Sequence, residues 1–153
     1  MKKIILFLTL ISFVFASCQG LPPKDVSQEK EPDPADMFVG TYSFSSTQYS
    51  KWGNLPILSS NYNGQFSISK VGNIDIKITG FFNGTGYISE SLLYIDPKTV
   101  SDNAGTINWT YTPAHLSGDG ILSFTINGQG ELKENNIAYP YTCTMSVAAT
   151  KEP

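Results

Sequence analysis

The sequence predicts an all-β domain of antiparallel strands, and three observations support this prediction. After residue 36, apolar and polar residues alternate with a period of two, no segment shows a convincing helical period, and turn dipeptides recur between the alternating runs. Clean alternation gives a sheet one buried face and one solvated face, which is typical of antiparallel pairing. Regularly spaced short strands favour a meander that closes into a small barrel, with a two-sheet β-sandwich as the alternative.

The alternating runs place the expected strands along the domain. The first run places Phe38, Gly40, Tyr42 and Phe44 on one face, and the last keeps odd-numbered apolar residues together over 137–149. The dipeptide Gly72-Asn73 is suited to a primed hairpin turn. The remaining runs are 65–69, 74–79, 107–112 and 122–126, and further turns are expected at 63–64, 83–84, 103–105, 118–120 and 127–128. Residues 114–117 have the composition of one short helical turn.

The overall composition excludes several classes of function. Of the 153 residues, 15% are charged, against about a quarter in an average globular protein. The chain contains no arginine, the residue best suited to clamp a phosphate or carboxylate with two hydrogen bonds. With a net charge of −3 and no basic patch, nucleic-acid binding has no electrostatic basis.

The first residues have the pattern of an export signal. Lys2 and Lys3 are followed by an apolar run over residues 4–15, which is shorter than the about 20 residues needed to cross a bilayer. The small residues Ala16 and Ser17 then precede Cys18. This order is typical of a signal peptide, here residues 1–17.

The segment Phe15-Ala16-Ser17-Cys18 resembles the lipobox of bacterial lipoproteins. The resemblance implies cleavage before Cys18 and acylation of its sulfur and its new amino group. Several acyl chains hold a protein on a membrane durably, whereas one chain does not. We therefore expect the membrane as a partner, reached through the lipid on Cys18, and the cell envelope as the location, at the outer membrane of a Gram-negative bacterium. The alternative is an ordinary secretory signal followed by a chance cysteine.

Residues 18–36 are expected to form the lipidated cysteine and a flexible tether. The stretch 19–36 is rich in proline and acidic residues and has only Leu21 and Val26 as large apolar side chains. Such a segment cannot bury enough surface to fold, and its prolines favour an extended spacer. The single all-β domain is then expected over 37–153.

The opening of the domain, Phe38-Val39-Gly40-Thr41-Tyr42, resembles the first strand of lipocalin-like (calycin) β-barrel lipoproteins. In that family a Gly-x-Trp motif places an aromatic ring in the closed end of the barrel, and a basic side chain from the last strand packs over it. The resemblance implies that Tyr42 takes the ring's position and Lys151 the base's. It also implies a small apolar ligand in the cup of the barrel.

A group of aromatic residues forms the candidate ligand-binding site. These residues lie in a poorly alternating stretch rich in Ser, Asn and Gly, or directly before an Asn-Gly turn. Aromatic rings beside amides can line the mouth of a barrel or stack on sugars. The alternative is that they cap the open end of a small core. The candidates are Tyr49, Trp52, Tyr62, Phe81 and Phe82.

No catalytic or metal-binding group stands out in the sequence. The only histidine, His115, has no nucleophile motif beside it, and Cys143 lies on the apolar face of the last run, where it is expected to pack in the core. We therefore expect no enzyme, no cofactor and no metal site.

Two functions remain open for this domain. The first is a monomeric binding module for a small apolar ligand. The second is a structural or interaction domain that binds a glycan or an envelope protein through surface aromatics. A carrier needs an incompletely filled interior, whereas an interaction domain needs a packed interior and exposed aromatic residues.

Overall fold

The computed structural model describes residues 33–153, which form one compact all-β unit. Each long run of alternation becomes a strand, because a period of two places every second side chain in the core. The described strands are β1 (Gly40–Trp52), β2 (Leu58–Lys70), β3 (Asp75–Gly80), β4 (Gly84–Ser89), β5 (Leu92–Ile95), β6 (Lys98–Asp102), β7 (Gly105–Tyr111), β8 (Ala114–Leu116), β9 (Ile121–Glu134) and β10 (Ile137–Lys151).

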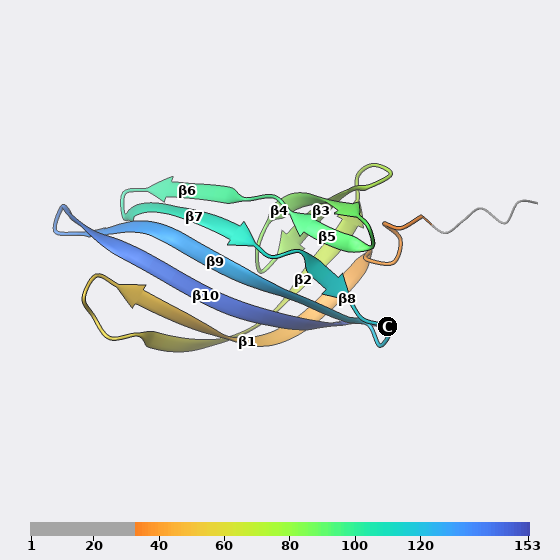
Figure 1. Ribbon diagram of the computed structural model, residues 1–153, viewed down its shortest axis with the longest axis horizontal. Coiled ribbons are helices and arrows are strands. Elements are labelled where there is room, and N and C mark those ends of the chain that lie inside the picture. The colour runs from red at the N-terminus through yellow and green to blue at the C-terminus, as the bar shows by residue number, and fades with distance from the viewer. Residues whose placement is uncertain (1–32) are drawn as a thin grey trace, which may run out of the picture. The chain divides into compact units, whose positions relative to one another are not determined.

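All described strands belong to one antiparallel sheet whose hydrogen bonds run in a ring (Figure 1). The ring order is β10-β1-β2-β3-β4-β5-β8-β9, and β9 pairs again with β10. The hairpin β6–β7 branches from the C-terminal half of β9. The prediction of an all-β antiparallel fold is therefore confirmed. The strands make one sheet rather than the two sheets of the alternative.

Four strands continue past the ring and, together with the hairpin β6–β7, form what we call the flared sheet. Its order is β2-β1-β10-β9-β7-β6, and it comprises residues 47–52, 58–63, 98–102, 105–111, 127–134 and 137–144. It exists because β1, β2, β9 and β10 are long, whereas β3, β4, β5 and β8 have between three and six residues. In Figure 1 the turns of the flared sheet lie at the end opposite the described N-terminal residues.

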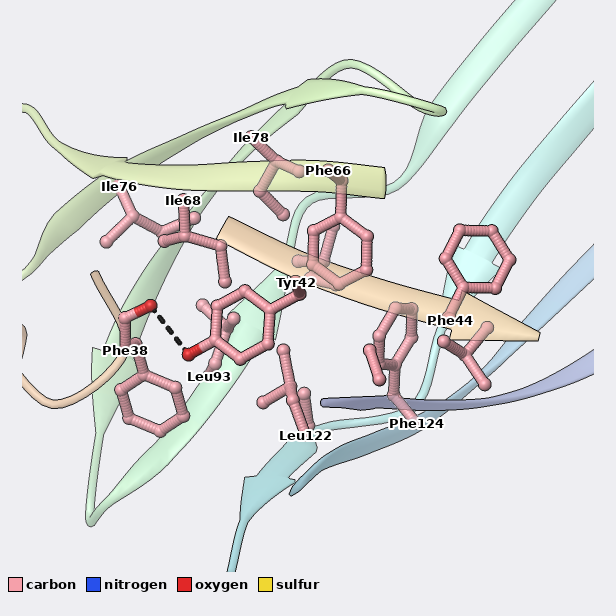
Figure 2. Packing of buried hydrophobic residues seen from close by; sticks show 14 of the residues in the cluster. Phe38, Tyr42, Phe44, Phe66, Ile68, Ile76, Ile78, Leu93, Leu122 and Phe124 are labelled. Carbon is pink, nitrogen blue, oxygen red and sulfur yellow. Dashed lines mark hydrogen bonds between the residues drawn. The ribbon is translucent and has the colours of Figure 1, made fainter. Parts of the chain in front are cut away.

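The ring encloses a filled apolar core (Figure 2). Tyr42 stacks on Phe66 with ring centroids 5.4 Å apart, and Phe66 also contacts Phe124 edge to face at 6.2 Å. On β10, the odd-numbered residues from 143 to 149 are buried, as the alternation predicts. Each fully buried large apolar side chain contributes about 1.5–3 kcal/mol to the stability of the fold. The apolar core inside the ring is therefore the main source of that stability.

A turn over residues 33–38 closes one end of the ring. The Asp36 N–H donates to the Asp33 carbonyl at 2.9 Å, and Ala35 and Phe38 are fully buried. The Tyr42 hydroxyl donates to the Phe38 carbonyl at 2.9 Å, as Figure 2 shows. Lys70 pairs with Asp33 and Asp36 at the surface. The last residues of the expected tether, 33–36, thus pack with the domain, and Phe38 lies in the turn rather than in the first strand.

Several turn predictions were wrong. Asn63-Gly64 and Asn127-Gly128 lie inside β2 and β9, and residues 114–116 form β8 instead of a helical turn. These two glycines make room for neighbouring rings: a Cβ on Gly64 would lie 3.1 Å from Phe44 Cε1.

The primed turns also lie elsewhere than predicted. Residues 71–74 do connect β2 and β3, but neither Gly72 nor Asn73 has a positive φ. The positive φ pairs of primed turns occur at Glu90-Ser91 and Asn135-Asn136, where both residues have φ between 51° and 63°.

The buried phenol of Tyr42 gives a test of the closed end. Burial raises the pKa of Tyr42 to about 12, whereas tyrosine in an unfolded chain has a pKa of about 10. The unfolded chain therefore loses this proton at a lower pH than the folded chain. The contribution of the Tyr42 phenol to the free energy of unfolding is fully present below about pH 10 and is lost as the pH rises towards about 12.

We expect Tyr42→Phe to be less stable than the wild type by about 1–3 kcal/mol at neutral pH, because the Phe38 carbonyl loses its donor. This difference should shrink by about 2 kcal/mol between about pH 9.5 and pH 11.5. Urea unfolding of both proteins across this range measures it. A constant difference would contradict the buried, hydrogen-bonded phenol.

Candidate functional site

An open groove of about 340 Å³ lies where the ring meets the flared sheet. Its walls come from β1, β6, β7, β9 and β10 and from the connection between β3 and β4. The lining residues are Gln48, Phe81, Phe82, Asn83, Lys98, Val100, Trp109, Tyr111, Ile126 and Met145.

Cross-strand register gathers these side chains on one face. Residues directly opposite each other in a sheet share a face. One row runs Gln48, Met145, Ile126, Tyr111 across β1, β10, β9 and β7. The next row runs Ser50, Cys143, Gly128, Trp109, Lys98 and reaches β6. The groove is thus built by pairing between strands that are far apart in the sequence.

Phe82 connects the groove to the core. Its ring lies 5.3 Å from Phe66, 6.0 Å from Phe124 and 5.9 Å from Tyr111, with the last pair stacked. Phe81, by contrast, is 41% exposed and contacts Phe44 edge to face at 4.8 Å. Phe82 therefore forms a fixed aromatic floor, and Phe81 offers an accessible ring at the rim.

The glycine at position 128 makes space for the tryptophan of the groove. A Cβ on Gly128 would lie 2.7 Å from Trp109 Cζ3 and 2.7 Å from Cys143 Sγ. Any side chain at this position would displace the indole or the buried thiol. The bare backbone of Gly128 thus fixes how deeply Trp109 sits.

Polar groups are few in the groove and lie among the apolar ones. The Gln48 amide donates to the Tyr141 hydroxyl at 3.4 Å, and the Asn83 side chain accepts from the Gly80 N–H at 3.3 Å. Burial raises the pKa of Tyr111, and burial followed by the neighbouring Cys143 raises the pKa of Tyr141, so both phenols are neutral at physiological pH. Lys98 supplies the only cationic side chain of the lining.

The structure gathers three of the five predicted aromatic residues and separates the other two. Phe81 and Phe82 line the groove, and Tyr62 contacts Phe81 at 6.0 Å. Tyr49 is 57% exposed and lies on the opposite face of β1 from Gln48, because neighbouring residues of a strand point to opposite sides. Trp52 lies at the far tip of the flared sheet.

At that tip, Trp52 contacts Tyr139 edge to face at 5.9 Å. Both rings line a separate hollow of about 490 Å³, together with Glu134 and Leu55. The Trp52 Nε1 atom is buried without a hydrogen-bond acceptor in the part of the chain that the structure describes.

Sequence reasoning did not assign Trp109, Tyr111, Lys98 and Met145 to the site. The alternation of 107–111 did place Trp109 and Tyr111 on a common face, but it could not show that this face lies opposite Phe82. That juxtaposition follows from the pairing of β7 with β9, which no local pattern specifies.

Tyr42 and Lys151 both lie at the closed end, away from the groove. They are directly paired between β1 and β10. Tyr42 is fully buried, and the Lys151 ammonium donates to the Met37 carbonyl at 3.0 Å. The Lys151 stem crosses Gly40, where a Cβ would lie 2.6 Å from Lys151 Cε and where φ is +150°. The lysine thus ties the end of β10 to the N-terminal turn.

Other candidate groups do not form a site within residues 33–153. These residues contain no group of three or more His, Cys, Asp or Glu side chains placed to hold a metal ion. Their free cysteine, Cys143, is buried, and His115 lies on β8 opposite Leu92 and Ser123. No helix in this range has the length and hydropathy to cross a membrane. Cys18, the expected signal peptide and residues 18–32 of the expected tether lie outside the described residues.

Comparison with known proteins found no matching family model, no matching curated protein and no matching solved structure. The groove and the sequence motifs are therefore the features from which a function is proposed.

The contact between Gly128 and Trp109 gives a test of the groove's construction. We expect Gly128→Ala to lower the free energy of unfolding by about 1–3 kcal/mol, because the new methyl group overpacks the indole and the thiol. Gly118→Ala is the matched control, since nothing lies within 4 Å of a Cβ there. Denaturant unfolding measures both variants, and equal stability of the two would contradict the tight packing at Gly128.

Proposed function

We propose that this chain is a lipid-anchored binding module of the bacterial cell envelope whose ring-closed sheet is a small lipocalin-like barrel. In this proposal the groove holds a small, largely apolar ligand. The observation that carries it is the open hollow over Phe82 and Trp109, which leaves apolar rings accessible beside a ring interior that is otherwise filled. A volume of about 340 Å³ is at the lower end of the range of about 300–1,000 Å³ for ligand sites.

The lining also indicates the ligand's polarity. The floor of Phe82, Ile126 and Met145 suits an apolar body, and Lys98 offers a cation at the rim. The neutral phenol of Tyr111 and the amides of Gln48 and Asn83 can form hydrogen bonds, and the lining contains no acidic side chain. An amphipathic molecule with one acidic group therefore complements the groove, with its acid directed to Lys98.

A second candidate is glycan binding through the outer face of the flared sheet. That face carries hydrogen-bonded polar pairs such as Thr144 with Asn127 and Thr99 with Asn108. Tyr49 stands exposed among them, next to Thr144 in the register of β1 and β10. An aromatic ring surrounded by hydroxyl and amide groups can stack on a sugar and bond its hydroxyls.

The anchor rests on the lipobox resemblance at Cys18. Since the domain that the structure describes begins at Asp33, residues 19–32 lie between it and Cys18. Fully extended, this spacer would reach on the order of 40 Å. The domain would then bind its ligand at some distance from the bilayer surface.

We expect the wild-type chain to incorporate an alkyne-labelled fatty acid and to enter the detergent phase on phase separation. Cys18→Ser should lose both properties, because no other thiol follows a signal-like segment. Cys143→Ser is the matched control and should keep both. Labelling that survives in Cys18→Ser would contradict the proposed anchor.

Ligand binding can be followed through Trp109, since the chain has only two tryptophans. In Trp52→Phe, Trp109 is the sole indole, and we expect a medium-chain fatty acid to shift its emission saturably. Lys98→Met should weaken this binding about two- to fivefold, as expected for loss of a partly exposed ion pair. The methyl ester of the same acid should bind Trp52→Phe and its Lys98→Met derivative equally.

Lys133→Met, which removes an exposed lysine from β9, is the control for net charge. If no amphipathic probe shifts the emission of Trp109, the groove proposal is wrong. If oligosaccharides instead bind the chain and Tyr49→Ala abolishes that binding, the second candidate is supported.

A further inference from the structure

The N-terminal half of β2 is an open edge of the sheet. Residues 58–64 pair with β1 on one side, whereas β3 pairs with β2 only from Phe66 onward. Within residues 33–153, no strand pairs with the other side of this segment. A long, unpaired strand edge is a template on which another strand can add.

The direction of the free backbone groups follows from two hydrogen bonds. The Gln65 carbonyl accepts from the Phe81 N–H at 2.9 Å, and the Val71 N–H donates to the Asp75 carbonyl at 2.9 Å, both on the side of β2 away from β1. Since successive residues of a strand alternate, odd-numbered residues of β2 direct their N–H and C=O away from β1. Ser59, Asn61 and Asn63 therefore present these groups at the open edge.

This edge lacks the protection that exposed strands usually have. No charged residue occurs between Lys51 and Lys70, so the whole of 52–69 is uncharged. The opposite edge of the flared sheet, β6, begins with Lys98 and ends with Asp102. Charges on an edge strand oppose the addition of another strand. By this criterion β6 is protected and β2 is not.

Exposed apolar side chains lie along the same edge. Ile57 is 66% exposed and Leu58 is 60% exposed, while Phe81 is 41% exposed beside Gly64. Apolar surface of this kind gains free energy when a partner covers it. The edge thus offers both unpaired hydrogen-bonding groups and apolar area.

We propose that the β2 edge docks the β2 edge of a second copy of this chain, in an antiparallel pair centred on Asn61. Ser59 of each copy then lies opposite Asn63 of the other, and the free groups form about six hydrogen bonds. Leu58 of each copy lies opposite Gly64, next to the exposed ring of Phe81.

The second copy is the occupant because the edge is self-complementary. Two identical charged strands would repel each other at this spacing, but two uncharged strands do not. Pairing of an edge with itself also closes into a two-fold dimer, whereas pairing of β2 with β6 of another copy would continue without end. This dimer replaces the monomer expected from the sequence.

Cysteine cross-linking of the full chain in intact cells tests the proposal. At the two-fold centre the Asn61 Cα atoms would lie about 5.5 Å apart, within the range of about 4.4–6.8 Å that a disulfide spans. We expect Asn61→Cys to give a disulfide-linked dimer. Thr99→Cys on the β6 edge is the matched control and should not, and the wild type controls for Cys143.

Adding Asn63→Pro removes one edge donor from each copy without breaking the β1–β2 ladder. At about fivefold for each hydrogen bond, the initial rate of cross-linking should fall on the order of 25-fold. Circular dichroism of each purified variant establishes that it is folded.

A folded Asn61→Cys chain that forms no dimer would overturn the proposal. Equal cross-linking at Thr99→Cys, or a rate that Asn63→Pro leaves unchanged, would overturn it as well. A disulfide between Asn61→Cys and a different protein would show that the edge docks another partner and not a second copy.

Discussion

The pairing of β10 on both of its sides is the constraint on which the rest of the structure depends. β10 pairs with β1 and with β9 over most of its length, and its ladder with β1 joins the beginning of the domain to its end. The two ladders also determine which side chains are neighbours in the core. Ala149 on β10 is paired with Phe44 on β1 and with Leu122 on β9, so a small side chain lies between two large ones. Without this strand the ring would be an open sheet with two long edges.

The groove is a consequence of unequal strand lengths. Where β3, β4, β5 and β8 end, the ring loses one of its walls, while β1, β9 and β10 continue and contribute Gln48, Ile126 and Met145 to the groove. Phe82 packs on Phe66 and Phe124 and forms the end of the core that faces the groove. The hairpin β6–β7 then adds Trp109 and Lys98 to the wall. A filled interior and a ligand-sized hollow therefore coexist in the same small domain.

Much of the fold could be predicted from the sequence, because a period of two is a local signal. It identified β1, β2, β3, β7, β9 and β10, the antiparallel sheet and the buried faces of β1 and β10, whereas the short strands β4, β5, β6 and β8 match no predicted run. It could not identify the strand ends: Asn-Gly at 63–64 and 127–128 reads as a turn, but these glycines serve instead to admit the rings of Phe44 and Trp109. Phe81 and Phe82 are predicted as site residues because they directly precede the Asn-Gly pair at 83–84. The separation of Tyr49 from the groove could not be predicted, because the side on which it lies depends on the continuation of β1 to Trp52, and the place of Trp109 could not be predicted because it depends on long-range pairing.

Hydrogen exchange at individual backbone amides tests the closure of the ring most directly. Amides at the edge of an open sheet exchange through local fraying, whereas those in a closed ring of strands exchange only when the domain unfolds. We expect the paired amides of β1 and β10 near Phe44 and Ala149 to be as protected as those between β9 and β10 near Leu122. Rapid exchange confined to the β1–β10 ladder would contradict the closed ring and, with it, the groove that the ring supports.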